Sequence, residues 1–167
     1  FLKHEIDTGQ IIFQEKEPIL PEDNVGSVYI RLMNKGASLV LKTVRAIEAN
    51  DYPQEPQDTP DELKAAPKIF RETCEINWSR SSSEVINLLR GLSPYPAAWT
   101  TWRDKILKIF TAEEISISSN KGEGAIWVEG KDMLVAKTSN GHLQLTEVQL
   151  EGKKRMNAAD LVRGLQL

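Results

Sequence analysis

The chain has 167 residues, of which 40% are hydrophobic and 27% are charged, and its formal net charge is −3. A chain of this size can bury one core or two small ones, but not the core of a large enzyme. It contains no apolar run of the roughly 18 to 20 residues that a membrane span requires, and it begins with no signal-peptide pattern. We therefore expect a soluble, cytoplasmic protein with no membrane partner.

Metal chemistry is not expected from the residue types. Cys74 is the single cysteine, and the two histidines, His4 and His142, are far apart in sequence. A zinc site needs several such ligands at short, regular spacing. We therefore expect no metal ion and no internal disulfide.

The charge is distributed unevenly along the chain. Residues 1–75 contain 9 Lys/Arg and 14 Asp/Glu, whereas residues 76–167 contain 12 and 10. The mildly basic second half permits contact with a polyanion, but a surplus of this size does not establish such contact.

The first part of the chain predicts a strand followed by a long helix. The strand is expected at Ile11–Phe13, after a tight turn. Apolar residues then recur every three or four positions, which predicts a helix that starts at Asp23 or Asn24 and ends near Asn50. Because the chain starts at Phe1 without an initiator Met and runs straight into the strand, we expect these elements to close a domain that begins upstream.

Residues 51–75 predict a linker between two domains. Four prolines interrupt this polar stretch, at positions 53, 56, 60 and 67. Proline fixes φ and therefore stiffens an extended chain. We place the domain boundary here and interpret Cys74 as a linker thiol without function.

Residues 76–167 are expected to form a small β-barrel with flanking helices. Ser81 and Glu84 have the spacing of a capping box, and Gly91 is placed to end the helix that follows. Short strands separated by turns come next, at Trp99–Trp102, Ile106–Phe110, Ala125–Val128, Met133–Lys137 and His142–Leu150. This spacing favours a barrel of the OB type over a sandwich, and a last helical turn is predicted at Asn157–Arg163.

Three segments carry a resemblance to a known family. Residues 4–12 contain Asp7-Thr8-Gly9; residues 76–79 and 86–99 contain Asn-Trp-Ser and Leu-Leu-Arg-Gly-Leu-Ser-Pro-Tyr-Pro-Ala-Ala-Trp; residues 148–156 contain Gly-Lys-Lys-Arg-Met. Taken in this order, they resemble the C-terminal half of the methionyl-tRNA formyltransferase family. The resemblance implies an α+β fragment: the end of a Rossmann-like catalytic domain at 1–50, a linker, and an OB-like tRNA-binding domain.

The resemblance also implies an activity. The family transfers a formyl group from formyltetrahydrofolate to the amino group of methionine on initiator tRNA, in translation initiation. Of its active-centre Asn, His and Asp, only the Asp has a counterpart here, which is Asp7. Most of the folate pocket would lie upstream, so the fragment is expected to be inactive alone. Gln10 stands where the family often has Asp, which weakens any role for a second acid there but leaves Asp7 in place.

Five cations are expected to contact tRNA: Lys68, Arg90, Lys153, Lys154 and Arg155. The last three lie in the matched Gly-Lys-Lys motif, although a charge run of this kind can equally be a solvated loop. Lys68 matches a linker lysine of the family, and Arg90 is as readily an ordinary exposed helix charge. The expected partners are initiator methionyl-tRNA, which accepts the formyl group, and formyltetrahydrofolate, which donates it; a monomer is expected.

The four tryptophans allow two interpretations. Trp78, Trp99, Trp102 and Trp127 are possible stacking platforms for bases. Packing between the helix and the barrel is the preferred interpretation for Trp78 and Trp99, because both lie in apolar motif positions.

Two rival functions stay open from the sequence. One is another formyltetrahydrofolate-dependent enzyme, which acts on a sugar nucleotide or on the folate itself. The other is a stand-alone OB-like nucleic-acid-binding module, although this leaves Asp7-Thr8-Gly9 and the long helix unexplained.

Overall fold

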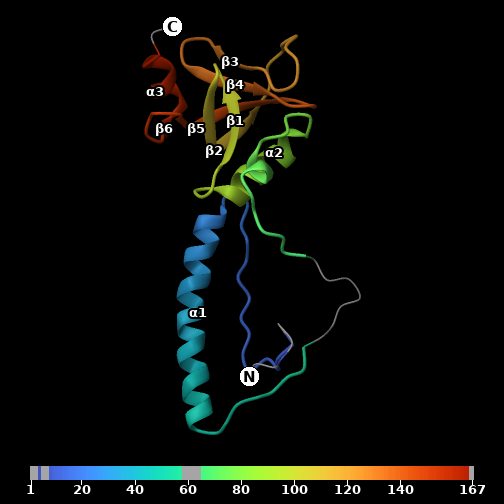
Figure 1. The fold of residues 1–167 in the computed structure, drawn as a ribbon, viewed down its shortest axis with the longest axis vertical. Helices are drawn as coiled ribbons and strands as arrows, with labels where there is room; N and C mark the ends of the chain where they lie inside the picture. Colours follow the sequence, from blue (N-terminus) through green and yellow to red (C-terminus); the bar gives the residue numbers. More distant parts are fainter. Residues whose placement is uncertain (1–3, 5–7, 58–64, 166–167) are drawn as a thin grey trace. The chain divides into compact units, whose positions relative to one another are not determined.

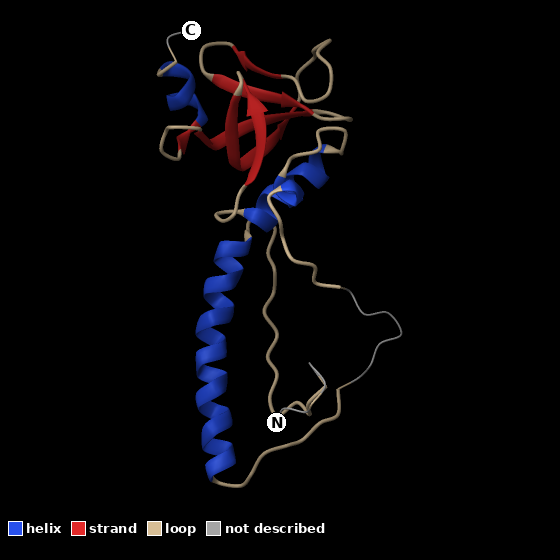
Figure 2. Ribbon diagram, viewed as in Figure 1, coloured by secondary structure: helices blue, strands red, loops and turns tan. Residues whose placement is uncertain are grey.

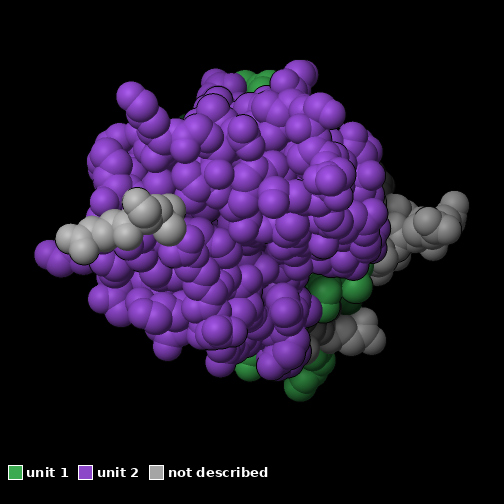
Figure 3. Space-filling model, turned by 90° about the horizontal axis from the view of Figure 1, so that it is seen from above, with its two compact units in different colours: residues 1–21, 27–68 green, residues 22–26, 69–167 purple. Residues whose placement is uncertain are grey.

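The computed structural model of the chain describes residue 4, residues 8–57 and residues 65–165. The chain forms two compact units, which are coloured separately in Figure 3. Unit 1 contains residues 1–21 and 27–68, and unit 2 contains residues 22–26 and 69–167. Unit 2 therefore starts earlier in the sequence than the domain expected at residue 76, and it also takes in the residues at which the long helix begins.

The long helix is confirmed as α1, Val25–Glu48. Its apolar stripe is exposed: within the described part of the chain, no α1 residue is buried. The large side chains on this surface include Tyr29, Ile30, Leu32, Met33, Val40, Leu41, Val44 and Ile47. A helix of this length owes its stability mainly to the packing of such a stripe.

The prediction of a strand at Ile11–Phe13 is wrong. Ile11 forms only an isolated antiparallel bridge, in which its N–H donates to Glu55 O at 2.8 Å and its carbonyl accepts from Glu55 N at 2.9 Å. A lone pair of extended segments does not make a stable sheet, because a sheet needs several strands with a shared apolar face. The segment is held to α1 by Glu17, which pairs with Arg31 and Lys35.

Helix α2, Ser82–Leu92, starts at the predicted capping box. Ser81 Oγ accepts from Glu84 N, and the Glu84 carboxylate accepts from Ser81 N at 3.0 Å. Two orphan N–H groups at the helix start are thereby satisfied. Gly91 does not end the helix as expected; the helix continues to Leu92, whose side chain is buried.

The centre of unit 2 is a curled antiparallel sheet of six strands (Figure 1). The strands are β1 (Ala98–Trp102), β2 (Lys105–Ile115), β3 (Ile126–Glu129), β4 (Met133–Lys137), β5 (His142–Leu150) and β6 (Met156–Asn157). Their order is β1-β2-β5-β4-β3, and β6 pairs with β5. The five predicted strands are confirmed, with β2 longer than expected; the short β6 was not predicted.

The two ends of the sheet are β1 and β3. The Trp102 indole N–H, at the end of β1, donates to the carbonyl of Ile126 on β3 at 3.3 Å. Helix α2 packs on β1 and β2, whereas α3 (Ala158–Arg163) packs on β4 and β5 (Figure 2). Asn157 caps α3 as predicted, because its side chain accepts from Ala159 N at 2.9 Å.

The core is formed by the sheet together with α2 and α3. Its most deeply buried large side chains include Leu89, Leu107, Ile109, Leu134, Leu143, Leu145, Val148 and Leu161. Cys74, at the end of a short 3₁₀ turn (Glu72–Cys74), is part of this core with 2% of its surface exposed. The interpretation of Cys74 as a linker thiol is therefore wrong, because its side chain contributes to apolar packing.

Candidate nucleic-acid interface

The residue expected to be catalytic, Asp7, lies outside the described residues. The segment that follows it belongs to unit 1. There, the Gly9 carbonyl accepts from Gln57 Nε2 at 2.7 Å, two residues before the bridge between Ile11 and Glu55. His4, for which no role was expected, is exposed.

The predicted basic loop connects β5 to β6 in unit 2. Gly152 has φ 78°, a left-handed conformation that suits glycine. The loop is closed by Lys153 N, which donates to Leu150 O at 2.8 Å, and by Gln149 Nε2, which donates to Lys153 O at 3.0 Å. This turn leaves the side chains of Lys153 and Lys154 exposed. They are two adjacent positive charges on a backbone fixed by hydrogen bonds.

Arg155 differs from its two neighbours, because its charge is paired. Its Nε and Nη2 donate to the two carboxylate oxygens of Glu147 at 2.7 and 2.6 Å. The guanidinium also lies 4.0 Å from the centre of the Phe110 ring. A two-point pair of this kind fixes the arginine in one orientation. Arg155 therefore anchors the end of the loop to the sheet.

Arg90 also has a structural role. Its Nε donates to the Asp23 carbonyl at 2.7 Å, and its Nη1 donates to Asn87 Oδ1 at 3.3 Å. The side chain is half-buried, not an ordinary exposed helix charge. It ties the residues before α1 to the end of α2, where Gly26 N also donates to Ser93 O at 3.1 Å.

Lys68 is the last residue of unit 1, and its side chain is exposed. The predicted cations thus differ in character. The structure brings Lys153, Lys154 and Arg155 together on one loop. It places Arg90 and Lys68 elsewhere, on α2 and on the extended segment before Ile69.

The packing interpretation of the tryptophans is confirmed for Trp78. Its ring is buried, and its indole N–H donates to Thr100 Oγ1 at 3.1 Å. Trp99 is only half-buried, and its indole N–H donates to Arg71 O at 3.0 Å. Trp99 therefore presents part of its ring to the surface of unit 2.

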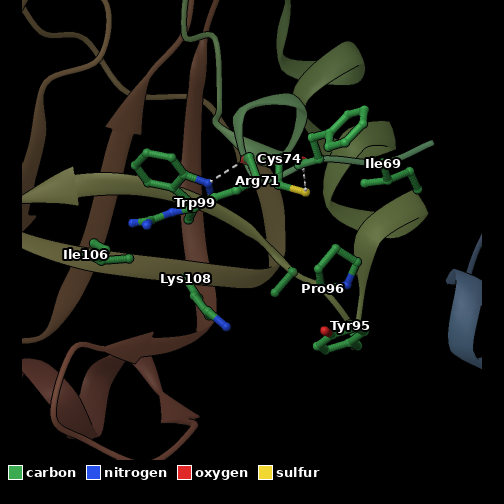
Figure 4. Close-up of a pocket in the computed structure, with 10 residues that line it drawn as sticks. Ile69, Arg71, Cys74, Tyr95, Pro96, Trp99, Ile106 and Lys108 are labelled. Atoms are coloured by element: carbon green, nitrogen blue, oxygen red, sulfur yellow. Dashed lines mark hydrogen bonds between the residues drawn. The ribbon is translucent and has the colours of Figure 1, made fainter. Parts of the chain in front are cut away.

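Next to Trp99 lies a pocket of about 490 Å³ that the sequence reasoning missed (Figure 4). Its walls come from residues 69–71 and the 3₁₀ turn that follows them, from the loop between α2 and β1, and from residues of β1 and β2. The lining side chains include Phe70, Arg71, Tyr95, Trp99 and Lys108. The sequence did contain one signal for this pocket. Phe70 and Tyr95 are aromatic residues beside charges or prolines, and neither fits the apolar pattern of a strand or a helix.

The described residues contain no cluster of His, Cys, Asp or Glu that could hold a metal ion. No helix in the described ranges is both long enough and apolar enough to cross a membrane.

Comparison with known proteins places this chain among formyl transferases. Residues 68–166 match the family described as "Formyl transferase, C-terminal domain". A methionyl-tRNA formyltransferase of Phocaeicola vulgatus is 43% identical over 98% of the chain. The chain spans about half the length of the curated relatives it matches, 53% in that case.

Two solved structures share the fold. HypX from Aquifex aeolicus, in complex with tetrahydrofolic acid, has a TM-score of 0.69 at 17% identity; the match covers 96% of this chain and 28% of HypX. WlaRD, a sugar 3N-formyl transferase, has a TM-score of 0.60 at 22% identity over 92% of this chain and 53% of WlaRD. Because the family match covers more than half of its residues, the chain belongs to the formyl transferase C-terminal domain family.

Proposed function

We propose that the chain is the C-terminal half of an enzyme that transfers a formyl group from formyltetrahydrofolate to the amino group of methionyl initiator tRNA. The observation that carries this proposal is the 43% identity, over 98% of the chain, to a protein named for that reaction. The likeness to a sugar formyl transferase supports the sugar-nucleotide alternative less well, because 22% identity supports a common fold and no more. The reaction belongs to translation initiation, and we propose the cytoplasm as its compartment.

Unit 2 is proposed to hold the tRNA. Lys153 and Lys154 extend from a rigid loop, and neither is paired with a carboxylate within the described ranges. Lysines at such positions add affinity for phosphates without reading sequence. Arg155 contributes less charge, because Glu147 neutralises it; its proposed part is to fix the loop. Lys68 and Arg90 stay in the proposal as secondary contacts, with Arg90 limited by its bond to Asp23.

Asp7 is proposed as a group of the active centre. The attacking amine must lose a proton while negative charge develops on the formyl oxygen. A carboxylate that orients an imidazole or a water can serve both needs. The folate donor is supported by the tetrahydrofolic acid bound to a protein of the same fold.

The sheet of unit 2 is proposed to be an OB-like barrel. The hydrogen bond from the Trp102 side chain to the Ile126 carbonyl supports this proposal, because it joins the two end strands of the sheet. We further propose that the protein is a monomer.

A filter-binding titration with initiator tRNA tests the role of the loop. The double variant Lys153→Ala, Lys154→Ala is expected to weaken binding and to reduce the salt slope by about 0.7 to 0.9 for each lost phosphate contact. The matched control is Lys121→Ala, Lys131→Ala, two exposed lysines in other loops of unit 2. An unchanged affinity and slope for the loop variant would remove the loop from the interface.

The role of Asp7 is tested in the intact enzyme, with the upstream half present. Asp7→Asn is expected to lower turnover by about 10²- to 10⁴-fold, the range for loss of a proton-transfer group. Turnover near the wild-type rate would exclude Asp7 from the active centre.

A further inference from the structure

The exposed aromatic side chains of unit 2 gather at one place. Its large hydrophobic residues with the greatest exposure are Tyr95 at 82%, Ile69 at 57% and Phe70 at 55%, and all three line the pocket beside Trp99 (Figure 4). Beyond these, Val25 at the start of α1 is the unit's other large exposed hydrophobic residue in the described ranges. Apolar surface gathered in a concave pocket is typical of a ligand site.

The pocket also has a positive side. Lys108 and Arg71 contribute to its walls, and within the described part of the chain neither is paired with a carboxylate. The Arg71 guanidinium lies 5.3 Å from the centre of the Trp99 ring. Aromatic rings beside unpaired cations suit a ligand with a planar ring and a negative charge, which is the chemistry of a nucleotide.

The pocket is connected to the basic loop by the register of the sheet. Trp99 on β1 lies opposite Lys108 on β2, and Lys108 lies opposite Gln149 on β5. Side chains directly opposite on neighbouring strands lie on the same face and within contact range. Gln149 in turn donates to the carbonyl of Lys153. Trp99, Lys108, Gln149 and Lys153 thus form a row across the sheet. A second hollow of about 210 Å³ lies along this row and is lined by Ile106, Lys108, Gln149 and Glu151.

One carboxylate borders the row. Glu151 accepts a hydrogen bond from Ile106 N at 3.1 Å, and its own N–H donates to Ile106 O at 2.8 Å. Its position is thus set by the backbone of β2. The row as a whole stays cationic, because Lys108, Lys153 and Lys154 outnumber it.

We propose that this pocket takes an unpaired nucleotide of the bound RNA. The base stacks among Phe70, Tyr95 and Trp99, and the phosphate chain follows Lys108 and Gln149 toward Lys153 and Lys154. This inference rests on the proposed binding of tRNA by unit 2 and adds a specific subsite to it. The pocket would accept an unpaired base and exclude a paired one, because the bases inside a duplex have no free face to stack on the rings.

The test is the fluorescence anisotropy of a labelled single-stranded RNA pentamer titrated with the 167-residue chain at low salt. Tyr95→Ala is expected to weaken binding by about five- to 150-fold, the range for loss of one base stack. The matched control is Tyr29→Ala, which removes a similarly exposed aromatic ring, 65% exposed, from α1. It is expected to leave the affinity unchanged within about twofold.

A second variant tests the charge. Lys108→Gln is expected to reduce the salt slope by about one phosphate contact, whereas Lys131→Gln leaves it unchanged. Because Tyr95 is exposed, its truncation should not alter the midpoint of urea unfolding, and an unchanged midpoint shows that a loss of affinity comes from the pocket. Equal affinity of Tyr95→Ala and the wild-type chain for the pentamer would overturn the proposal. So would binding of AMP as tight as that of the pentamer, because the site would then be one for a free nucleotide.

The result separates this inference from the proposed function. If Tyr95→Ala leaves the pentamer affinity unchanged but the Lys153, Lys154 variant loses tRNA affinity, the pocket is overturned and the proposed tRNA interface stands. If Tyr95→Ala weakens binding of the pentamer and the loop variant keeps full affinity for tRNA, the subsite is supported and the role of the loop fails.

Discussion

Removal of one hydroxyl group, by Thr138→Val, is expected to destabilise unit 2. Thr138 has none of its surface exposed, and its Oγ1 lies 2.8 Å from Ser82 Oγ at the start of α2. The same atom accepts from Gly141 N at 3.1 Å in the turn between β4 and β5. Valine keeps the shape of threonine but leaves the Ser82 hydroxyl and the Gly141 N–H without this partner. A buried polar group left unsatisfied costs about 1–3 kcal/mol, so the free energy of unfolding should fall by about that amount.

Urea unfolding followed by tryptophan fluorescence measures this loss. The signal reports unit 2 alone, because all four tryptophans lie in it: Trp78, Trp99, Trp102 and Trp127. The control is Thr101→Val, which makes the same change at an exposed position of β1. It is expected to alter stability by no more than about 0.5 kcal/mol.

A double-mutant cycle identifies the partner. Once Ser82→Ala has removed the facing hydroxyl, Thr138→Val should cost less than it does in the wild-type chain, with a coupling energy of about 0.5–3 kcal/mol. Strictly additive effects, or a Thr138→Val variant as stable as Thr101→Val, would refute the view that this hydrogen bond joins α2 to the hairpin.

Three further predictions concern charge. Hydrogen bonds from the Ser81 hydroxyl, and to a lesser extent from the Ser81 N–H, hold the pKa of Glu84 below its ordinary value of 4.5. The Glu84 carboxylate therefore stabilises the fold at pH values above 4.5, and this stabilisation is lost as the pH falls below 4.5. The unfolding midpoints of Glu84→Gln and the wild type should converge over the same range. Burial lowers the pKa of His142 below its ordinary value of 6.5. As the pH drops, the unfolded state therefore binds a proton at this histidine before the folded state does, and the free energy of unfolding should fall below pH 6.5. His142→Gln should remove this pH dependence in urea unfolding. Glu147→Gln should free the charge of Arg155 and thereby raise tRNA affinity and steepen its salt dependence by about one contact in filter binding; an unchanged slope would place Arg155 outside the interface.

The local elements of this protein were determined by sequence. The apolar period of α1, the capping box at Ser81 and Glu84, the alternating strands and the Asn157 cap each depend on residues a few positions apart. Such patterns act through the geometry of a single helix or strand, so they can be recognised without the tertiary structure. The three family segments likewise identified the domain without any coordinates.

The tertiary structure alone decided which charged and aromatic side chains meet. The pairing of Arg155 with Glu147, the bond from Arg90 to Asp23, and the alignment of Trp99 with Lys108 all join residues that are distant in sequence. The alignment of Trp99 with Lys108 depends on strand register, because a shift of one residue in register would send a side chain to the opposite face of the sheet. The bond from Arg90 depends instead on how α2 packs against the residues before α1. For this reason sequence could nominate the cations of the loop, but only the folded sheet could separate the paired arginine from the exposed lysines and place an aromatic pocket beside them.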